Sequence, residues 1–317
     1  MKRVEKAIHK IIFECLKIKQ SESLLVVTDD INSELADLFV LKASSRNVES
    51  FLLQIPRLKS ESLELSATAR RFVNNTNTIV LLTEPSLVHS KIIAHACHNG
   101  NRIICLNGTD TAILEKSVNV DYDFISRMCS RIADIFSIGR KVEVTTRAGT
   151  DISFRISRHK GNVNDGCAQT PGTFGILPAG EAYVIPDKKT MNGIVVIDGS
   201  IPEIGLVETP LKLYIKDGFV TQVIGDEIAD IVRKRIKRFG KNGRNVAEFG
   251  IGANPGVTLT GRSIADEKKL GTAHIALGDH LAEGGSTPKK LHLDMVFHKP
   301  TVIVDGRPLL TAGKLMD

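Results

Sequence analysis

The sequence has few aromatic residues, few cysteines and no long apolar segment, and each shortage excludes a class of protein. Aromatic residues make up only 5% of the 317 residues, and the basic residues behind the net charge of +6 are scattered. Because no aromatic-rich basic strand offers stacking for bases, we expect no nucleic-acid partner. No apolar run approaches the roughly 20 residues that span a bilayer, so we expect no membrane association.

The five cysteines show no paired spacing, and an odd number argues against a disulfide framework. We therefore expect reduced thiols and a cytoplasmic protein. Cys97 and Cys105, the closest two, are expected to fill core positions rather than to bind a metal. The first 20 residues keep their charges throughout, which is typical of an amphipathic helix and not of a secretory signal.

Short apolar strands alternate with helices in the first 140 residues, which predicts a mainly parallel sheet covered on both faces. The stretch after the first strand, "VVTDDINSE", contains no glycine, which argues against a nucleotide site there. Asp30 or Asn32 is a candidate N-cap for the helix that follows. The expected strands are 24–27, 48–55, 78–83 and 102–107, and the expected helices are 3–19, 28–45, 61–74, 84–100 and 121–138.

The hydrophobic pattern of the sequence changes after residue 140. Alternating segments at 141–156, 211–225 and 301–310 predict hairpins, the last two centred on Asp-Gly. One clear helix, 226–239, interrupts them and ends at Gly240. We therefore predict an α/β domain over residues 1–140 and a β-rich α+β domain over 141–317 that carries the metal-binding and catalytic residues.

Polar residues occupy strands of the second half that otherwise read as buried. In "LHLDMVFH", alternation places His292 and Asp294 on one face and Leu291, Leu293 and Met295 on the other. Burying such groups is costly unless a partner offsets the cost, and a metal ion is one such partner. Further candidates at or beside strands are Glu181 in "PAGEAYVIP", Glu248 in "NVAEFGIGANPG", and Glu267 and His274 in "IADEKKLGTAH".

A lone buried glutamate is usually half of an ion pair, but several carboxylates and imidazoles in one half of the chain favour a metal site. Carboxylates and neutral imidazoles bind divalent first-row metals. The series "GEAYVIP", "EFGIGANPG", "DEKKLGTAHIALG" and "LHLDMVF" resembles the metal-binding half of the thermophilic metalloprotease family, the aminopeptidase T type. The resemblance covers about residues 175–310.

This resemblance implies a homodimeric metal-dependent aminopeptidase, a hydrolase that removes N-terminal residues from peptides or small amides. It implies two ions per chain, of zinc, cobalt or manganese. Glu248 would bridge them, and Glu181 or Glu267 would carry the proton from water to the leaving amine. The full set of implied ligands is Glu181, Glu248, Glu267, His274, His292 and Asp294.

The chain departs from that family at one position, because Leu281 stands where the family has a tyrosine. Asp279 and His280 are polar but displaced from it, and Tyr183 shares a strand face with Glu181. A core role for Tyr183 is the simpler interpretation.

Two alternatives stay open. The ring-cleaving dioxygenases that open 2,5-dihydroxypyridine resemble the same half of the chain and also carry a His-Leu-Asp segment, with a histidine in the place of Glu248. In that case His274, His292 and Asp294 would form a two-histidine, one-carboxylate site for a single ferrous ion. The other alternative is a metal-binding protein without peptidase activity.

Overall fold

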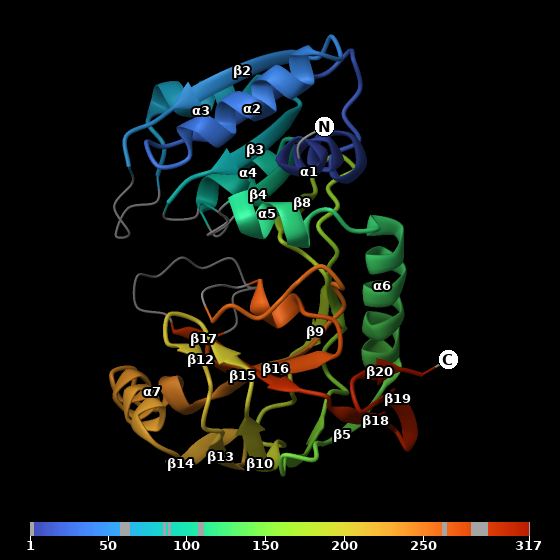
Figure 1. Cartoon of the computed structure of the whole chain (residues 1–317), viewed down its shortest axis with the longest axis vertical. Helices are drawn as coiled ribbons and strands as arrows, with labels where there is room; N and C mark the ends of the chain where they lie inside the picture. The colour runs from blue at the N-terminus through green and yellow to red at the C-terminus, as the bar shows by residue number, and fades with distance from the viewer. Residues whose placement is uncertain are drawn as a thin grey trace. The chain divides into compact units, whose positions relative to one another are not determined.

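The structure, a computed structural model, describes residues 3–57, 64–84, 87, 90–106, 111–261, 265–279 and 291–316. The described chain forms two compact units (Figure 1). The first contains residues up to 123 together with 164–179; the second contains 124–163, 180–279 and 291–316. Neither unit is continuous in sequence, and the predicted domain boundary at residue 140 stays a prediction.

The first unit is built on a five-stranded sheet with the order β2-β1-β3-β4-β8. Every neighbouring pair in it is parallel, as the alternation of apolar strands and helices predicts. Its strands are β1 (Ser23–Thr28), β2 (Glu49–Gln54), β3 (Thr78–Leu82), β4 (Arg102–Leu106) and β8 (Phe174–Leu177).

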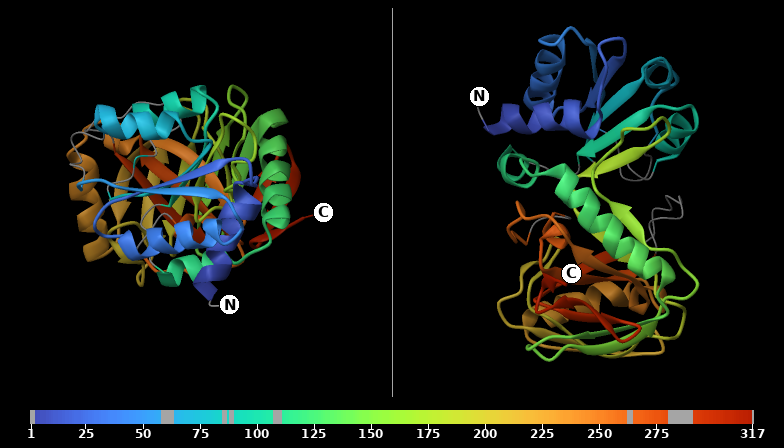
Figure 2. Two further views of the ribbon diagram at one scale, coloured as in Figure 1. Left: turned by 90° about the horizontal axis from the view of Figure 1, so that it is seen from above. Right: turned by 90° about the vertical axis from the view of Figure 1, so that its right-hand side faces the viewer.

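Helices cover both faces of this sheet (Figure 2). Leu25 and Val27 of β1 join a buried cluster with residues of α3 and α4, whereas Leu24 and Val26 are buried on the opposite face. The helices of the first unit are α1 (Arg3–Lys10), α2 (Ser33–Ser44), α3 (Ala67–Asn74), α4 (Lys91–His98) and α5 (Thr111–Ser117), with a π-helix η1 (Ile11–Cys15) after α1.

Three local expectations differ from the structure. The predicted helix 3–19 ends earlier, as α1 followed by the π-turn η1, and Lys17 then takes a positive φ of 49° that a right-handed helix cannot continue. Asn32 stands at the N-cap of α2, but its side-chain amide donates to Leu82 O and does not cap the helix. The short strand β8 was not predicted.

Among the described helices, none has the length and apolar character that crossing a membrane requires.

The second unit contains an antiparallel eight-stranded sheet and a five-stranded sheet, as well as a two-stranded one. The eight-stranded sheet has the order β14-β13-β10-β6-β5-β18-β19-β20 and the five-stranded one the order β17-β16-β15-β9-β7. The first sheet contains β5 (Lys141–Thr145), β6 (Asp151–Arg155), β10 (Asn192–Ile197), β13 (Leu211–Lys216), β14 (Phe219–Ile224), β18 (Thr301–Val304), β19 (Arg307–Thr311) and β20 (Lys314–Leu315).

The remaining elements of this unit lie around those strands. The five-stranded sheet contains β7 (Asn162–Asn164), β9 (Glu181–Val184), β15 (Val246–Gly252), β16 (Thr272–Gly278) and β17 (His292–His298). The small sheet pairs β11 (Ser200–Ile201) with β12 (Gly205–Leu206). The helical elements are α6 (Tyr122–Ile138), α7 (Glu227–Lys237), and the 3₁₀ turns η2 (Asn242–Arg244) and η3 (Asp266–Lys268).

The predicted hairpins are present. Asp217 and Gly218 join β13 to β14 with φ values of 51° and 76°, and Asp305 and Gly306 join β18 to β19 with 49° and 80°. Two positive φ angles at the centre of the turn match the right-handed twist of the strands. The predicted α/β part with a parallel sheet and the β-rich part are therefore both confirmed.

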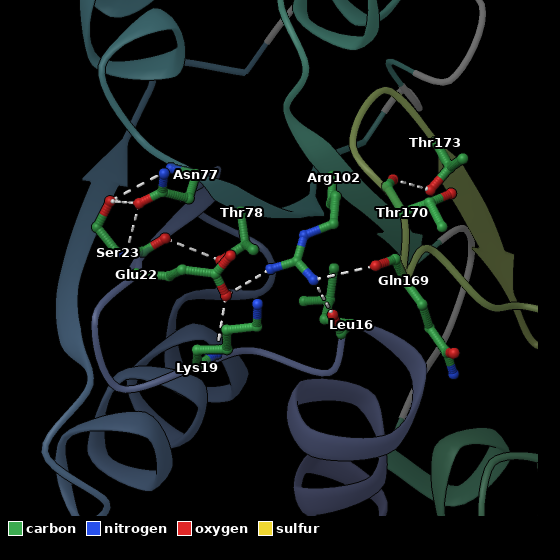
Figure 3. A network of polar contacts seen from close by, with 10 residues as sticks. All are labelled: Leu16, Lys19, Glu22, Ser23, Asn77, Thr78, Arg102, Gln169, Thr170 and Thr173. Carbon is green, nitrogen blue, oxygen red and sulfur yellow. Dashed lines mark hydrogen bonds and ion pairs between the residues drawn. The ribbon is translucent and has the colours of Figure 1, made fainter.

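A buried arginine ties the N-terminal segment to the first sheet (Figure 3). Arg102, at the start of β4, donates to Glu22 Oε2 at 2.6 Å, to Leu16 O at 2.7 Å and to Gln169 O at 3.4 Å. Its side chain is 6% exposed. A buried guanidinium is tolerated only when its donors are satisfied, so these three segments are held by one group.

Replacing this arginine should destabilise the first unit. Arg102→Met removes the donor to the Leu16 carbonyl and the ion pair with Glu22, which keeps the hydrogen bond from Lys19 N–H. We expect the free energy of unfolding to fall by about 2–4 kcal/mol. Urea unfolding followed by circular dichroism measures the change. Arg70→Met is the control, because the Arg70–Glu64 pair of the same unit is more than half exposed on both sides and should contribute at most about 1 kcal/mol. Equal losses in the two variants would contradict the anchoring role of Arg102.

Candidate metal centre

The candidate site lies on one face of the five-stranded sheet of the second unit. The other face is apolar: the ring of Phe249 of β15 packs at a tilt against Phe154, with 5.2 Å between centroids, and meets Phe136 edge-on at 6.1 Å. Because side chains alternate along a strand, the residues next to Phe249, Glu248 and Gly250, point to the opposite face. The polar residues of β9, β16 and β17 share that face, which explains why each reads as an exception in an apolar strand.

The strand register brings the carboxylates toward one another. Glu248 of β15 pairs with Ala276 of β16, and Ala276 pairs with Asp294 of β17. The small Ala276 therefore separates two acidic residues that lie two strands apart, and its methyl leaves room for their longer side chains to converge. His292 lies two residues before Asp294 on the same face, opposite Gly278.

Two glycines of the "EFGIG" segment make space for the site. A Cβ at Gly250 would lie 2.2 Å from Cε1 of His274, so the imidazole occupies the volume that any larger residue would fill. A Cβ at Gly252 would lie 2.1 Å from Lys269 O and 2.8 Å from Glu267 O, so only glycine lets η3 approach β15 this closely.

One group of candidate ligands is formed by Glu248, His292 and Asp294, whose ligand atoms lie within 4.8 Å of one another. His292 Nδ1 lies 2.9 Å from Asp279 O. A carbonyl only accepts, so Nδ1 carries the proton and Nε2, 3.2 Å from Asp294 Oδ1, faces the group. Burial alone would lower the pKa of His292, but Asp294 and then Glu248 outweigh it and raise this pKa to about 10. Burial would raise the pKa of Asp294, but His292 holds it well below its usual value.

The second group is formed by Glu181, Glu267 and His274, all buried. His274 Nε2 joins the two groups, because it lies 3.7 Å from Glu181 Oε2 and 3.4 Å from Glu248 Oε1. Lys268, 3% exposed, donates to both glutamates of this group, to Glu181 Oε1 at 2.5 Å and to Glu267 Oε1. Burial, followed by the charge of Asp294, raises the pKa of Glu267 well above its usual value.

Charge indicates that the cluster fits a cation. Four buried carboxyl groups lie around one ammonium and two imidazoles, and burial raises the pKa of Glu248 and of Glu267, so their charged forms are disfavoured without a further cation. Burial of unpaired carboxylates is costly. A divalent ion at Glu248, His292 and Asp294 would offset that charge with donors that first-row metals accept. The donor set therefore fits a divalent metal.

The structure brings all six predicted ligands together, and their role as ligands stays a prediction. His298 lies at the opposite end of β17, outside both groups, where its backbone N–H donates to Asp198 Oδ1 at 2.8 Å. Tyr183 of β9 pairs with Gly250 of β15 and so lies beside the cluster. Burial and then the charges of Glu248 and Glu181 raise the pKa of its hydroxyl. Asp279 contributes only its carbonyl, since its carboxylate accepts from Asn242. His280 and Leu281 lie outside the described residues.

Sequence reasoning missed Lys268. A lysine next to another lysine in "DEKK" usually lies on a solvated face, and no periodicity marks this one as buried. The only signal was its position directly after two acidic residues, of which Asp266 is also buried and accepts the backbone N–H groups of Thr260 and Gly261.

A buried set of carboxylates and imidazoles on a rigid sheet defines a protein with a candidate divalent-metal centre. The sequence matches the family NicX: 2,5-dihydroxypyridine 5,6-dioxygenase over residues 6–317, and the chain belongs to this family. A 2,5-dihydroxypyridine 5,6-dioxygenase from Pseudomonas putida KT2440 is 22% identical over 195 residues, which are 56% of this chain and 54% of that protein. The match thus spans about half the length of that relative.

Two solved structures share the fold. The structure of 2,5-dihydroxypyridine dioxygenase from Pseudomonas putida KT2440 superposes with a TM-score of 0.85 at 17% identity, covering 99% of this chain and 96% of that one. Wild-type AmpT from Thermus thermophilus gives a TM-score of 0.68 at 14% identity, covering 100% and 99%. At these identities the similarity shows a common fold and not a common activity.

The prediction of a metal-dependent aminopeptidase is wrong, because the chain belongs to the dioxygenase family. The predicted hydrolase class and the predicted peptide or amide substrate are therefore wrong as well. The proton-carrying roles of Glu181 and Glu267 belonged to peptide hydrolysis and lose their support. The homodimer rested on the same resemblance and loses its support. The resemblance itself reflects a relation of fold, which the AmpT structure shows. Its ordered motifs specify where the carboxylates and imidazoles lie, and not the reaction.

Gly250→Ala should displace the His274 ring, because the new methyl would overlap Cε1. We expect the free energy of unfolding to fall by about 1–3 kcal/mol, as for other overpacked cores. Thermal or urea unfolding measures the loss. In a His274→Ala background the overlap is removed, so adding Gly250→Ala should then cost much less. An equal cost in both backgrounds would show that the imidazole is not what requires glycine here.

Metal binding should release protons at neutral pH. With a pKa of about 10, His292 is charged at pH 7 in the metal-free protein, whereas a metal binds neutral imidazole. Binding of Mn²⁺ at pH 7 should therefore release about one proton or more per ion, and affinity should rise about tenfold per pH unit up to about pH 10. Isothermal titration calorimetry in buffers of different ionisation enthalpy measures the release. Heats that do not depend on the buffer would show that His292 is already neutral.

Proposed function

We propose that this chain is a ring-cleaving dioxygenase that holds one ferrous ion at Glu248, His292 and Asp294 and acts on a dihydroxylated pyridine. The observation that supports it most is the family match over residues 6–317. The name of the Pseudomonas putida relative, 2,5-dihydroxypyridine 5,6-dioxygenase, suggests 2,5-dihydroxypyridine as the substrate, with oxygen added at carbons 5 and 6.

Iron, when bound, would supply the redox chemistry through which dioxygen and an electron-rich hydroxylated ring react. The chain's own residues prepare that position. The Asp279 carbonyl fixes the His292 ring with Nε2 toward the group, and the buried Asp294 carboxylate lies against the same nitrogen. His274 Nε2 faces Glu248 Oε1 and orients that carboxylate. Because Glu248, His274 and Asp294 are buried, the substrate ring would meet them with little competing water.

Glu248 distinguishes this chain from the two-histidine, one-carboxylate pattern considered for the dioxygenases. Its carboxylate makes the donor set more anionic by one charge, and both carboxylates and imidazoles suit divalent iron. His274, expected to complete that pattern with His292 and Asp294, instead gathers with Glu181 and Glu267. The proposed iron site therefore has one imidazole and two carboxylates.

The test uses the purified chain reconstituted with Fe²⁺ without oxygen, then supplied with 2,5-dihydroxypyridine and ¹⁸O₂. We expect loss of the ring absorbance, equal consumption of dioxygen and substrate, and two labelled oxygen atoms in the product. His292→Ala should bind iron more weakly and turn over more slowly, by more than the roughly 10–100-fold that loss of an outer hydrogen-bond partner causes.

His298→Ala is the matched control, because it removes an imidazole from the same face of β17 outside both groups. It should retain both iron and turnover. A wild-type chain that holds its iron and leaves dihydroxypyridines intact in the presence of dioxygen would refute the proposed activity.

A further inference from the structure

Lys268 occupies the centre of the second group of acidic residues. Its side chain is 3% exposed, and its ammonium contacts Glu181 Oε1 at 2.5 Å and the carboxylate of Glu267. These two glutamates, with His274, are the residues whose ligand atoms gather within 4.8 Å as a second candidate metal group. A cation already lies among them, and it belongs to the chain.

The backbone around Lys268 is fixed from several sides. Lys268 O accepts from Asn254 N at 2.8 Å, and Leu270 N donates to Asn254 O at 2.9 Å, so the turn is attached to the end of β15. Asp266 accepts from Thr260 N and Gly261 N and fixes the start of the same turn. The ammonium is thus held in place by its surroundings.

An ammonium and a divalent ion would compete for the same two carboxylates. A metal at Glu181, Glu267 and His274 would share each carboxylate with Lys268, which contacts one oxygen of each, and it would bring a second positive centre within a few ångströms of the ammonium. In the first group, the described residues supply no such internal ammonium to Glu248, His292 and Asp294.

We infer that Lys268 takes the place of a second metal ion, so that the chain binds a single divalent ion, at Glu248, His292 and Asp294. This inference rests on the proposed function for the location of that ion and extends it to the role of the second group. Glu181 and Glu267 then bind the lysine and not a metal. Lys268 is a positioning residue, because its charge acts on the iron site through Glu181, His274 and Glu248.

Metal counting tests this inference without any turnover. The metal-free protein is titrated with Mn²⁺ by calorimetry, and bound metal is counted by mass spectrometry after removal of free ions. Wild type should bind one ion per chain. Lys268→Met removes the ammonium and keeps an unbranched side chain of similar length, so the freed carboxylates should accept a second ion. Electron paramagnetic resonance of this variant should then show two coupled Mn²⁺ ions.

Lys269→Met is the matched control, since this neighbouring lysine is only partly buried and reaches the Val257 carbonyl instead of the carboxylates. It should bind one ion. Glu181→Gln gives a test that does not depend on the folding of Lys268→Met: it should keep one ion, whereas Glu248→Gln should weaken binding of that ion.

Two ions in wild type, one ion in a folded Lys268→Met variant, or loss of the single ion in Glu181→Gln would each overturn the inference. These outcomes differ from failure of the proposed function. A wild-type chain with one ion and no activity on dihydroxypyridine refutes the function and leaves the role of Lys268 intact.

Discussion

The burial of four carboxylates on one face of a single sheet is the constraint on which the second unit depends. Such a cluster is stable only when cations offset its charge, and the surrounding sequence is arranged to admit them. The His274 ring occupies the volume that a side chain at Gly250 would fill, and the absence of a side chain at Gly252 allows η3 to pack close to β15. The small side chain of Ala276 leaves space between Glu248 and Asp294. The apolar face around Phe249 supports the strands from behind. Stability and function therefore draw on the same few residues.

Sequence periodicity predicted the parts of the fold that follow from local rules. Apolar strands between helices indicated the parallel sheet, and each Asp-Gly pair specified a turn with two positive φ angles. The strand β8 could not be predicted, because its four residues carry no pattern of their own and it joins β4 from about 70 residues further along the chain. The early end of the first helix was missed because nothing before Lys17 breaks the amphipathic pattern.

For the site, alternation within "LHLDMVFH" was enough to place His292 and Asp294 on a common face. The other four residues were candidates because they stand at or beside apolar strands, and the motif resemblance implied their role as ligands. The structure then divides these six between two groups, a division that depends on strand register and on Lys268. Neither the strand register nor the burial of Lys268 can be predicted from the sequence. Register is a pairing between distant segments, and no local pattern distinguishes a buried lysine from a solvated one. The reaction was mispredicted for a related reason: carboxylates and imidazoles in this order describe a sheet with candidate metal ligands, and the same fold is shared by a 2,5-dihydroxypyridine dioxygenase and by AmpT.

In the arrangement we propose for this sheet, the positions of the cations and the chemistry of the cations depend on different features. The sheet fixes the positions of the acidic residues, whereas the identity of the cation beside each of them depends on single side chains such as Lys268 and Glu248. An ammonium supplies one positive charge and hydrogen bonds but offers no open coordination position, so a lysine in place of a divalent metal offsets part of the carboxylate charge while removing one reactive centre. In the arrangement we propose, one group keeps its donors for a redox-active ion and the other is closed by the chain itself. Because a fold does not determine the reaction, the cation that lies beside each group of carboxylates is a more direct guide to the chemistry than the sheet itself.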